Sequence, residues 1–125
     1  MNAGEIRRRT GVARFEERKH PRFLLNLPVE YYRLKGDTQQ AGYTINASEG
    51  GLMVTLSEKL EVGELLKIKL FFSFGPEMNA IETLSRVVWT NRGEKDEEYR
   101  TGVQFLEISP EDQNRLSLFL RKMAN

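Results

Sequence analysis

The chain has 125 residues, 39% of them hydrophobic and 30% charged, a formal net charge of +1 and no cysteine. This length predicts a single domain with one core, and the lack of cysteine excludes a disulfide framework, a thiolate metal site and a cysteine nucleophile. Neither an apolar run of the roughly 18 residues that a membrane span requires nor the apolar stretch of a signal peptide is found, so we expect a cytosolic protein.

Charge is distributed unevenly along the chain. Residues 1–22 carry seven Lys or Arg and three Glu, a net charge of +4, whereas residues 23–125 carry 12 basic and 15 acidic residues, a net charge of −3. A basic segment on a mildly acidic body favours an anionic partner at one end of the molecule. Residues 1–14 show no hydrophobic periodicity, which predicts a flexible basic arm. An equally weighted alternative is that Arg7 to Arg9 belong to a solvated tail that binds no ligand.

From Phe23 onward, apolar and polar residues alternate in short runs separated by turn residues. This alternation is typical of β-strands with one face on a core. Pro28 lies inside the first run and predicts an edge or a bulge there, because proline cannot donate to a strand ladder. The expected strands cover residues 23–31, 41–45, 52–56, 66–72, 81–92 and 99–105.

The last segment has the pattern of a helix. Ser109 is a suitable N-cap, Pro110 suits the first helical position, and acidic residues follow in the first turn. Apolar residues then recur with helical spacing at Leu116, Phe119, Leu120 and Met123, which predicts a helix over residues 110–123. Six short strands favour a closed antiparallel barrel or a sandwich, and we expect the helix to pack across one open end.

Catalysis has little support in this sequence. The chain has one histidine, His20, and no group of His, Asp and Glu has the spacing of a metal site. Neither a hydrolytic triad nor a glycine-rich phosphate loop is recognisable. The sequence therefore predicts a binding protein without metal, cofactor or enzyme activity.

Two short motifs flank the beginning of the strand-rich region. Arg18 and Arg22 lie four residues apart directly before Phe23, and Asn46-Ala-Ser-Glu-Gly-Gly51 forms a polar turn between two expected strands. In this order they resemble the Arg-x-x-x-Arg and [Asp/Asn]-x-Ser-x-x-Gly motifs of the PilZ domain family, over about residues 15–123. The resemblance implies an all-β fold, a six-stranded antiparallel barrel with a C-terminal helix in residues 15–125, and a receptor for cyclic di-GMP.

The resemblance also implies how these residues would bind the ligand. An arginine clamps phosphate or pairs with the O6/N7 edge of guanine, and we assign this role to Arg18 and Arg22. Arg14 and Arg18 have the same spacing, but the pair that abuts the first strand fits the family better. In the turn, Asn46 offers an amide and Ser48 a hydroxyl. The glycines at the end of the turn, Gly50 and Gly51, let the backbone approach the ligand.

Further residues extend the resemblance. Arg86-Val-Val-Trp89, together with residues 99–105, is similar to the last two strands of the family. Arg86 or Trp89 would line the outer side of the ligand, although Trp89 equally fits the barrel core. Glu17 precedes the first motif arginine, where family members with two intercalated ligands tend to have arginine, so we expect one ligand molecule. Candidates for the missing charge are Arg14 and Arg7 to Arg9.

The functional hypothesis is a cyclic di-GMP receptor whose arm becomes ordered on the ligand and is then read by a downstream protein. We expect a monomer or a weak dimer. One alternative is a degenerate module of the same fold that binds proteins and no nucleotide. An RNA or single-stranded DNA binder would fit the basic arm, but the sequence lacks an aromatic ladder on a basic strand face, so no nucleic acid partner is expected.

Overall fold

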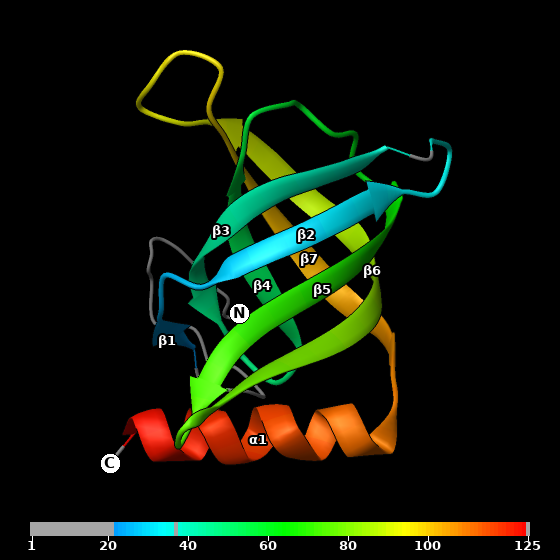
Figure 1. Ribbon diagram of the computed structural model, residues 1–125. Coiled ribbons are helices and arrows are strands. Elements are labelled where there is room, and N and C mark those ends of the chain that lie inside the picture. The colour runs from blue at the N-terminus through cyan, green and yellow to red at the C-terminus, as the bar shows by residue number, and fades with distance from the viewer. Residues whose placement is uncertain (1–21, 37, 125) are drawn as a thin grey trace, which may run out of the picture.

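The computed structural model describes residues 22–36 and 38–124. Within these residues, seven strands are followed by one helix at the carboxyl end (Figure 1). The elements are β1 (Phe23–Leu24), β2 (Pro28–Arg33), β3 (Gln39–Ala47), β4 (Gly51–Leu56), β5 (Leu65–Phe74), β6 (Glu77–Arg92), β7 (Tyr99–Ile108) and α1 (Pro110–Ala124).

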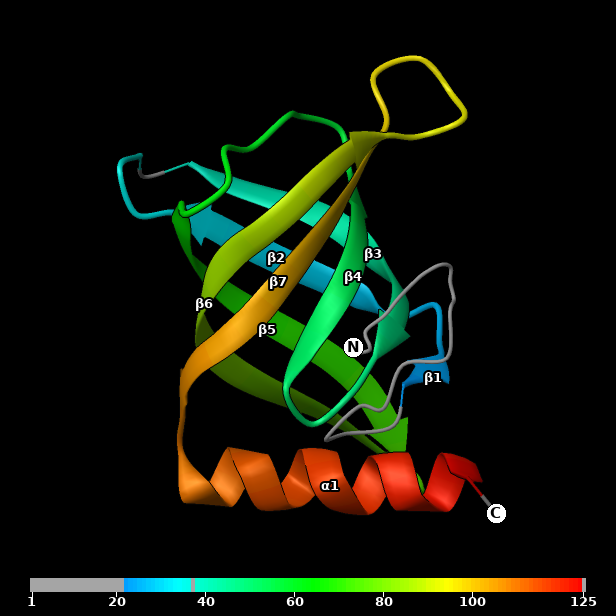
Figure 2. The ribbon, with the colours of Figure 1, turned by 180° about the vertical axis from the view of Figure 1, so that it is seen from behind.

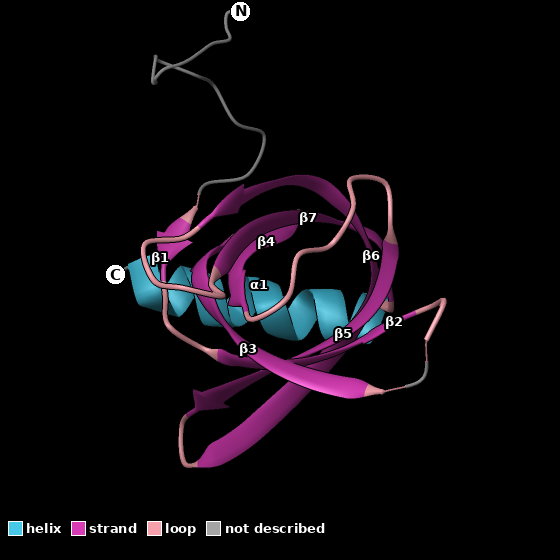
Figure 3. Ribbon diagram, turned by 90° about the horizontal axis from the view of Figure 1, so that it is seen from above, coloured by secondary structure: helices cyan, strands magenta, loops and turns pink. Residues whose placement is uncertain are grey.

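Six of the strands close into an antiparallel barrel. Neighbouring strands follow the order β3-β2-β5-β6-β7-β4, and a further pairing of β4 with β3 closes the ring. The short strand β1 adds to the end of β3 outside this ring. Figure 2, seen from behind, shows β4 and β7 in front of β2 and β5, and Figure 3 looks along the barrel. The expected six-stranded barrel is therefore confirmed.

The alternating residues fill the inside of this barrel. In β5, Leu66, Ile68 and Leu70 are buried while Lys67 is exposed, so side chains point in and out in turn. The core consists of such inward residues from every long strand and from one face of α1. A closed ring leaves only its two ends to be covered.

Helix α1 lies across one end of the barrel, as expected (Figure 1). The rings of Phe72 and Phe119 meet there with their centroids 4.4 Å apart. The Ser109 hydroxyl accepts a hydrogen bond from the Asp112 amide at 3.1 Å, which confirms the predicted N-cap. Leu116, Phe119 and Leu120 are buried on the apolar face of the helix, whereas Met123, which continues this face, is 45% exposed. The helix passes beyond the barrel core before it ends.

The loop between β4 and β5 covers the other end and buries Leu60 completely. A polar cluster ties this loop to β2. The Tyr31 hydroxyl donates to Glu58 at 2.6 Å, and Arg33 pairs with Glu64 at 2.5 Å and with Glu58 at 3.1 Å. Burial and the bond to the Glu58 carboxylate raise the pKa of Tyr31, and the hydrogen bonds to Glu64 raise that of Arg33.

The expected first strand, residues 23–31, is interrupted at residues 25–27. Two backbone hydrogen bonds to β3 persist there, from the Leu25 amide to the Ile45 carbonyl at 3.3 Å and from the Thr44 amide to the Leu27 carbonyl at 2.8 Å. Between them the buried hydroxyl of Thr44 accepts from the Leu27 amide at 2.8 Å and donates to the Leu25 carbonyl. Pro28 opens β2, where its missing N–H costs no ladder bond in the strand interior. The second expected strand is longer than predicted, and β6 begins four residues earlier, at the Gly75-Pro76 turn.

Candidate functional site

A groove of about 660 Å³ runs along the outside of the barrel where β1, the β3–β4 turn and the β6–β7 pair meet. It brings together six of the residues that the sequence singled out, from three separate stretches of the chain. These are Arg22, Asn46, Ser48, Gly50, Gly51 and Trp89. Motif residues far apart in sequence thus share one cavity.

Pairing of the strands explains how Arg22 reaches the turn. β1 follows Arg22 directly and pairs with the end of β3, with Leu24 opposite Asn46. A register shift in β3 between Thr44 and Asn46 marks a bulge next to this point. Bulges re-aim side chains at such positions. Asn46 is 8% exposed and lines the groove, while Arg22 is exposed at its edge.

The β3–β4 turn is held together by Ser48. Its hydroxyl accepts hydrogen bonds from the amides of Gly50 at 3.1 Å and Gly51 at 3.2 Å. The Ser48 amide donates to the Gly51 carbonyl at 2.9 Å, and the side chain is only 7% exposed. In this conformation the hydroxyl shapes the turn rather than pointing freely at a ligand.

The same turn is anchored to its surroundings on two sides. The amide of Phe105 in β7 donates to the Gly50 carbonyl at 2.9 Å. The Gln113 side chain on α1 donates to the Glu49 carboxylate at 3.4 Å. The turn therefore has a fixed position against both the barrel wall and the helix.

Glycines on two neighbouring strands keep the floor of the groove low. A Cβ on Gly51 would lie 2.2 Å from the Val103 carbonyl oxygen, so the close approach of β4 and β7 requires glycine there. A Cβ on Gly102 would lie 2.2 Å from Nε1 of Trp89. The indole ring consequently covers Gly102 on the outer surface of the barrel.

A bulge explains why Trp89 lies outside. The register of β6 against β7 shifts between Val87 and Trp89. Val87 is buried, whereas Val88 is exposed and Trp89 is half-buried in the wall of the groove. Of the two places that the sequence left open for Trp89, the structure selects the outer wall. An indole in this position offers a flat surface for stacking.

The remaining candidates are not part of this lining. Arg86 is exposed on β6, opposite Gln104 of β7, but does not line the groove. Arg14 and Arg18 lie outside the described residues, as do Glu17, His20 and the arm over residues 1–14.

Sequence reasoning missed several groove residues. Met53 and Gln104 line the groove, and both occupy outward positions of strands in which alternate residues face the core. The alternation of apolar and polar residues along these strands is the sequence signal that could have identified them. Leu106 and Gln113 also line the groove, but only the pairing of β6 with β7 and the position of α1 bring them there.

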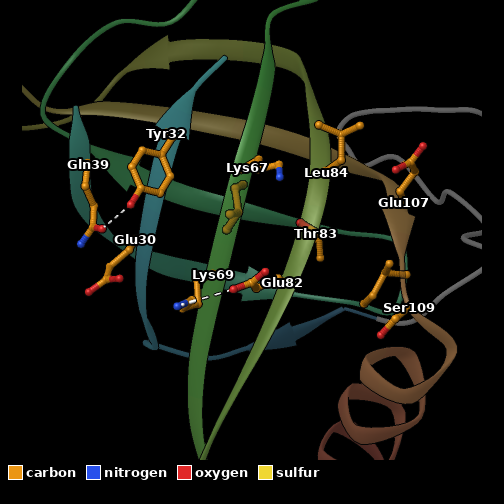
Figure 4. Close-up of a pocket in the computed structure, with 12 residues that line it drawn as sticks. Glu30, Tyr32, Gln39, Lys67, Lys69, Glu82, Thr83, Leu84, Glu107 and Ser109 are labelled. Carbon is orange, nitrogen blue, oxygen red and sulfur yellow. Dashed lines mark hydrogen bonds and ion pairs between the residues drawn. The ribbon is translucent and has the colours of Figure 1, made fainter. Parts of the chain in front are cut away.

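A second groove of about 620 Å³ crosses the outer faces of β2, β5, β6 and β7 (Figure 4). Its charges are mixed, and Lys69 and Glu82 form an ion pair at 3.5 Å. Tyr32 donates to Gln39 at 2.8 Å. Within residues 22–36 and 38–124, no group of three or more His, Cys, Asp and Glu residues has the arrangement of a metal site. The described part of the chain also has no helix with the length and apolarity to span a bilayer.

Known structures share this fold. The Bacillus subtilis inhibitor of motility MotI/DgrA superposes with a TM-score of 0.76 at 23% identity, over 89% of this chain and 53% of that one. YcgR of Escherichia coli in complex with c-di-GMP gives 0.70 at 15% identity, over 87% of this chain and 46% of that one. The separate PilZ domain of YcgR with c-di-GMP gives 0.67 at 16% identity, over 87% and 95%.

This chain spans about half the length of the first two structures, MotI/DgrA and full YcgR. No curated protein sequence matches it. The family model of the PilZ domain, however, matches residues 16–122, which include both motifs and every strand of the barrel. The chain belongs to the PilZ domain family.

Proposed function

We propose that this protein is a receptor for cyclic di-GMP that binds the dinucleotide in the groove beside the β3–β4 turn. One observation carries the proposal: Arg22, the turn from Asn46 to Gly51 and Trp89 line the same cavity. Family membership supports it, and c-di-GMP is the ligand named for the two YcgR structures with this fold.

Each lining residue has a chemical role that suits a guanine dinucleotide. The Arg22 guanidinium can bind a phosphate or the O6/N7 edge of a guanine. Asn46 offers its amide to the base edge, and Trp89 offers a stacking surface. Ser48 acts mainly by fixing the turn, so that the backbone next to Gly51 stays accessible to the ligand.

Regulation would involve the segment before the barrel. Arg18 supplies the second motif contact, with Arg14 as an additional charge, and one ligand molecule binds per domain. Ordering of residues 14–22 on the ligand creates a new surface for a downstream protein. The turn is anchored to α1 by the hydrogen bond between Gln113 and Glu49. This contact gives a second route by which ligand binding alters the protein surface.

Calorimetric titration with cyclic di-GMP, GTP and a short oligonucleotide tests the proposal. We expect saturable binding of cyclic di-GMP alone, at one molecule per domain. Arg22→Ala removes charge-assisted hydrogen bonds, each worth about 1.5–3 kcal/mol, so its affinity should fall at least tenfold, roughly. Arg92→Ala is the matched control, because Arg92 is exposed on β6 and does not line the groove.

Absence of binding by the wild-type protein would contradict the proposal and favour the protein-interaction module. Equal affinities of Arg22→Ala and Arg92→Ala would show that the ligand binds elsewhere. A larger loss with Arg14→Ala than with Arg22→Ala would mean that Arg14 and Arg18 form the motif pair.

A further inference from the structure

Arg86 is surrounded by aliphatic side chains on the outer face of the barrel. Leu65 lies opposite it on β5, and Leu84 and Val88 are its neighbours on the same side of β6. Leu106 follows on β7, two residues beyond the partner of Arg86 in that strand. Val88 is 42% and Leu106 39% exposed, and the two other leucines are half-buried. We call these five residues the Arg86 patch.

Two bulges enlarge this patch. In β6, Val87 pairs with Val103 and Trp89 with Gly102, so Val88 is an extra residue without a partner. In β7, Phe105 pairs with Ser85 and Glu107 with Leu84, so Leu106 between them is an extra residue without a partner. Extra residues of this kind disrupt the ladder and re-aim side chains. Both bulged residues are apolar and exposed, so the bulges add aliphatic surface to the patch.

Two loops add aliphatic residues at the rim. The Leu34 amide donates to the Leu65 carbonyl at 3.2 Å, and the Gly63 amide donates to the Val87 carbonyl at 2.7 Å. These bonds bring Leu34 and Val62 to the border of the Arg86 patch, and they are 50% and 64% exposed. Exposed apolar residues gathered on one face are typical of a site of protein association.

Opposite charges occur on this surface. Glu107 pairs with Leu84 in the strand register and lies beside it in Figure 4. Among the described residues, neither Arg86 nor Glu107 takes part in an ion pair. Lys67, on the β5 side of Leu84, adds a second cation at the edge. The surface thus contains a cation and an anion at different places on one aliphatic area.

We propose that the Arg86 patch binds a second copy of this chain and forms a two-fold symmetric dimer. A two-fold interface uses the same surface on both subunits, so a residue and its counterpart must be complementary. Arg86 and Glu107 meet this condition, because Arg86 of each copy faces Glu107 of the other and the aliphatic residues pack between the two ion pairs.

Val88 and Leu106 also line the groove proposed for cyclic di-GMP. Sedimentation velocity over a range of protein concentrations, without nucleotide, therefore tests this dimer separately from ligand binding. The wild-type protein should show a reversible monomer–dimer equilibrium. Arg86→Glu places like charges opposite each other, and so does Glu107→Arg, so each should raise the dimer dissociation constant at least tenfold, roughly. The double variant restores complementarity and should return the constant to the wild-type value. Arg92→Glu is the control for a charge reversal outside the patch.

Both changed residues are exposed, and circular dichroism with urea unfolding checks that all variants fold. A monomer at every concentration would overturn the proposal, and so would a dimer that neither single reversal weakens. A double variant as weak as the single ones would also overturn it, because the two charges would then not face each other.

Discussion

The Trp89 ring lies over Gly102, and replacement of this glycine by alanine tests the geometry of the groove wall. The new Cβ would lie 2.2 Å from Nε1 and 2.5 Å from Cε2 of the indole, whereas ordinary contacts begin at 3.4 Å. The ring must therefore retreat by about 1.2 Å or the strands must separate. Overpacking of this kind costs about 1–3 kcal/mol of unfolding free energy.

Two measurements detect the effect of Gly102→Ala. Urea unfolding gives the free energy, and tryptophan fluorescence reports the ring directly because Trp89 is the one tryptophan of the chain. We expect Gly102→Ala to destabilise the wild-type protein and shift its emission. In a Trp89→Ala background the obstacle is gone, so the same substitution should cost much less. Gly36→Ala is the control, because its nearest neighbour would be the Arg33 carbonyl oxygen at 4.0 Å.

Equal costs of Gly102→Ala in both backgrounds would refute this reasoning, as would an unchanged emission spectrum. The ring would then not rest on Gly102, and the outer wall of the groove would have to be described differently. A loss of cyclic di-GMP affinity that accompanies the spectral shift would link the ring position to the ligand.

Gly51→Val should lower both the free energy of unfolding and the affinity for cyclic di-GMP, because the new Cβ meets the Val103 carbonyl oxygen. Urea unfolding measures the first effect and calorimetry the second. An unchanged free energy of unfolding would contradict the close approach of β4 and β7. Burial alone would raise the pKa of Glu64, but hydrogen bonds from Arg33 and the Glu61 amide and the Arg33 charge outweigh it and lower the pKa. The stabilisation by ionised Glu64 is therefore present above its usual pKa of 4.5 and lost as the pH falls below it, so acid titration of Glu64→Gln should show a flatter stability curve than the wild type. Amides of residues 14–22 should gain protection from hydrogen exchange when cyclic di-GMP binds; equal protection with and without ligand would exclude ordering of the arm.

Much of the fold follows from the sequence because alternation is a local property. Each run with apolar residues at every second position became a strand, and the helix began at its predicted cap. The interruption at residues 25–27 was not predictable in this way. It depends on the hydroxyl of Thr44, which lies 17 residues from its hydrogen-bond partner Leu27. The position of Met123 likewise depends on where the barrel core ends beneath α1.

The candidate site was predictable only in part. The turn from Asn46 to Gly51 and Arg22 were recognisable because their spacing is a motif. The outward position of Trp89 required a bulge, and a bulge depends on pairing with β7 rather than on local alternation. For the same reason the pattern of β7 did not reveal that Gly102 is covered by the indole ring.

The most direct test of the central proposal is to locate the ligand by nuclear magnetic resonance, with cyclic di-GMP titrated into ¹⁵N-labelled protein. The account predicts the largest shifts at the indole N–H of Trp89 and the amides of Gly50, Gly51 and Gln104, all in the groove beside the β3–β4 turn. Shifts concentrated instead around Lys69, in the second groove across β2, β5, β6 and β7, would contradict it.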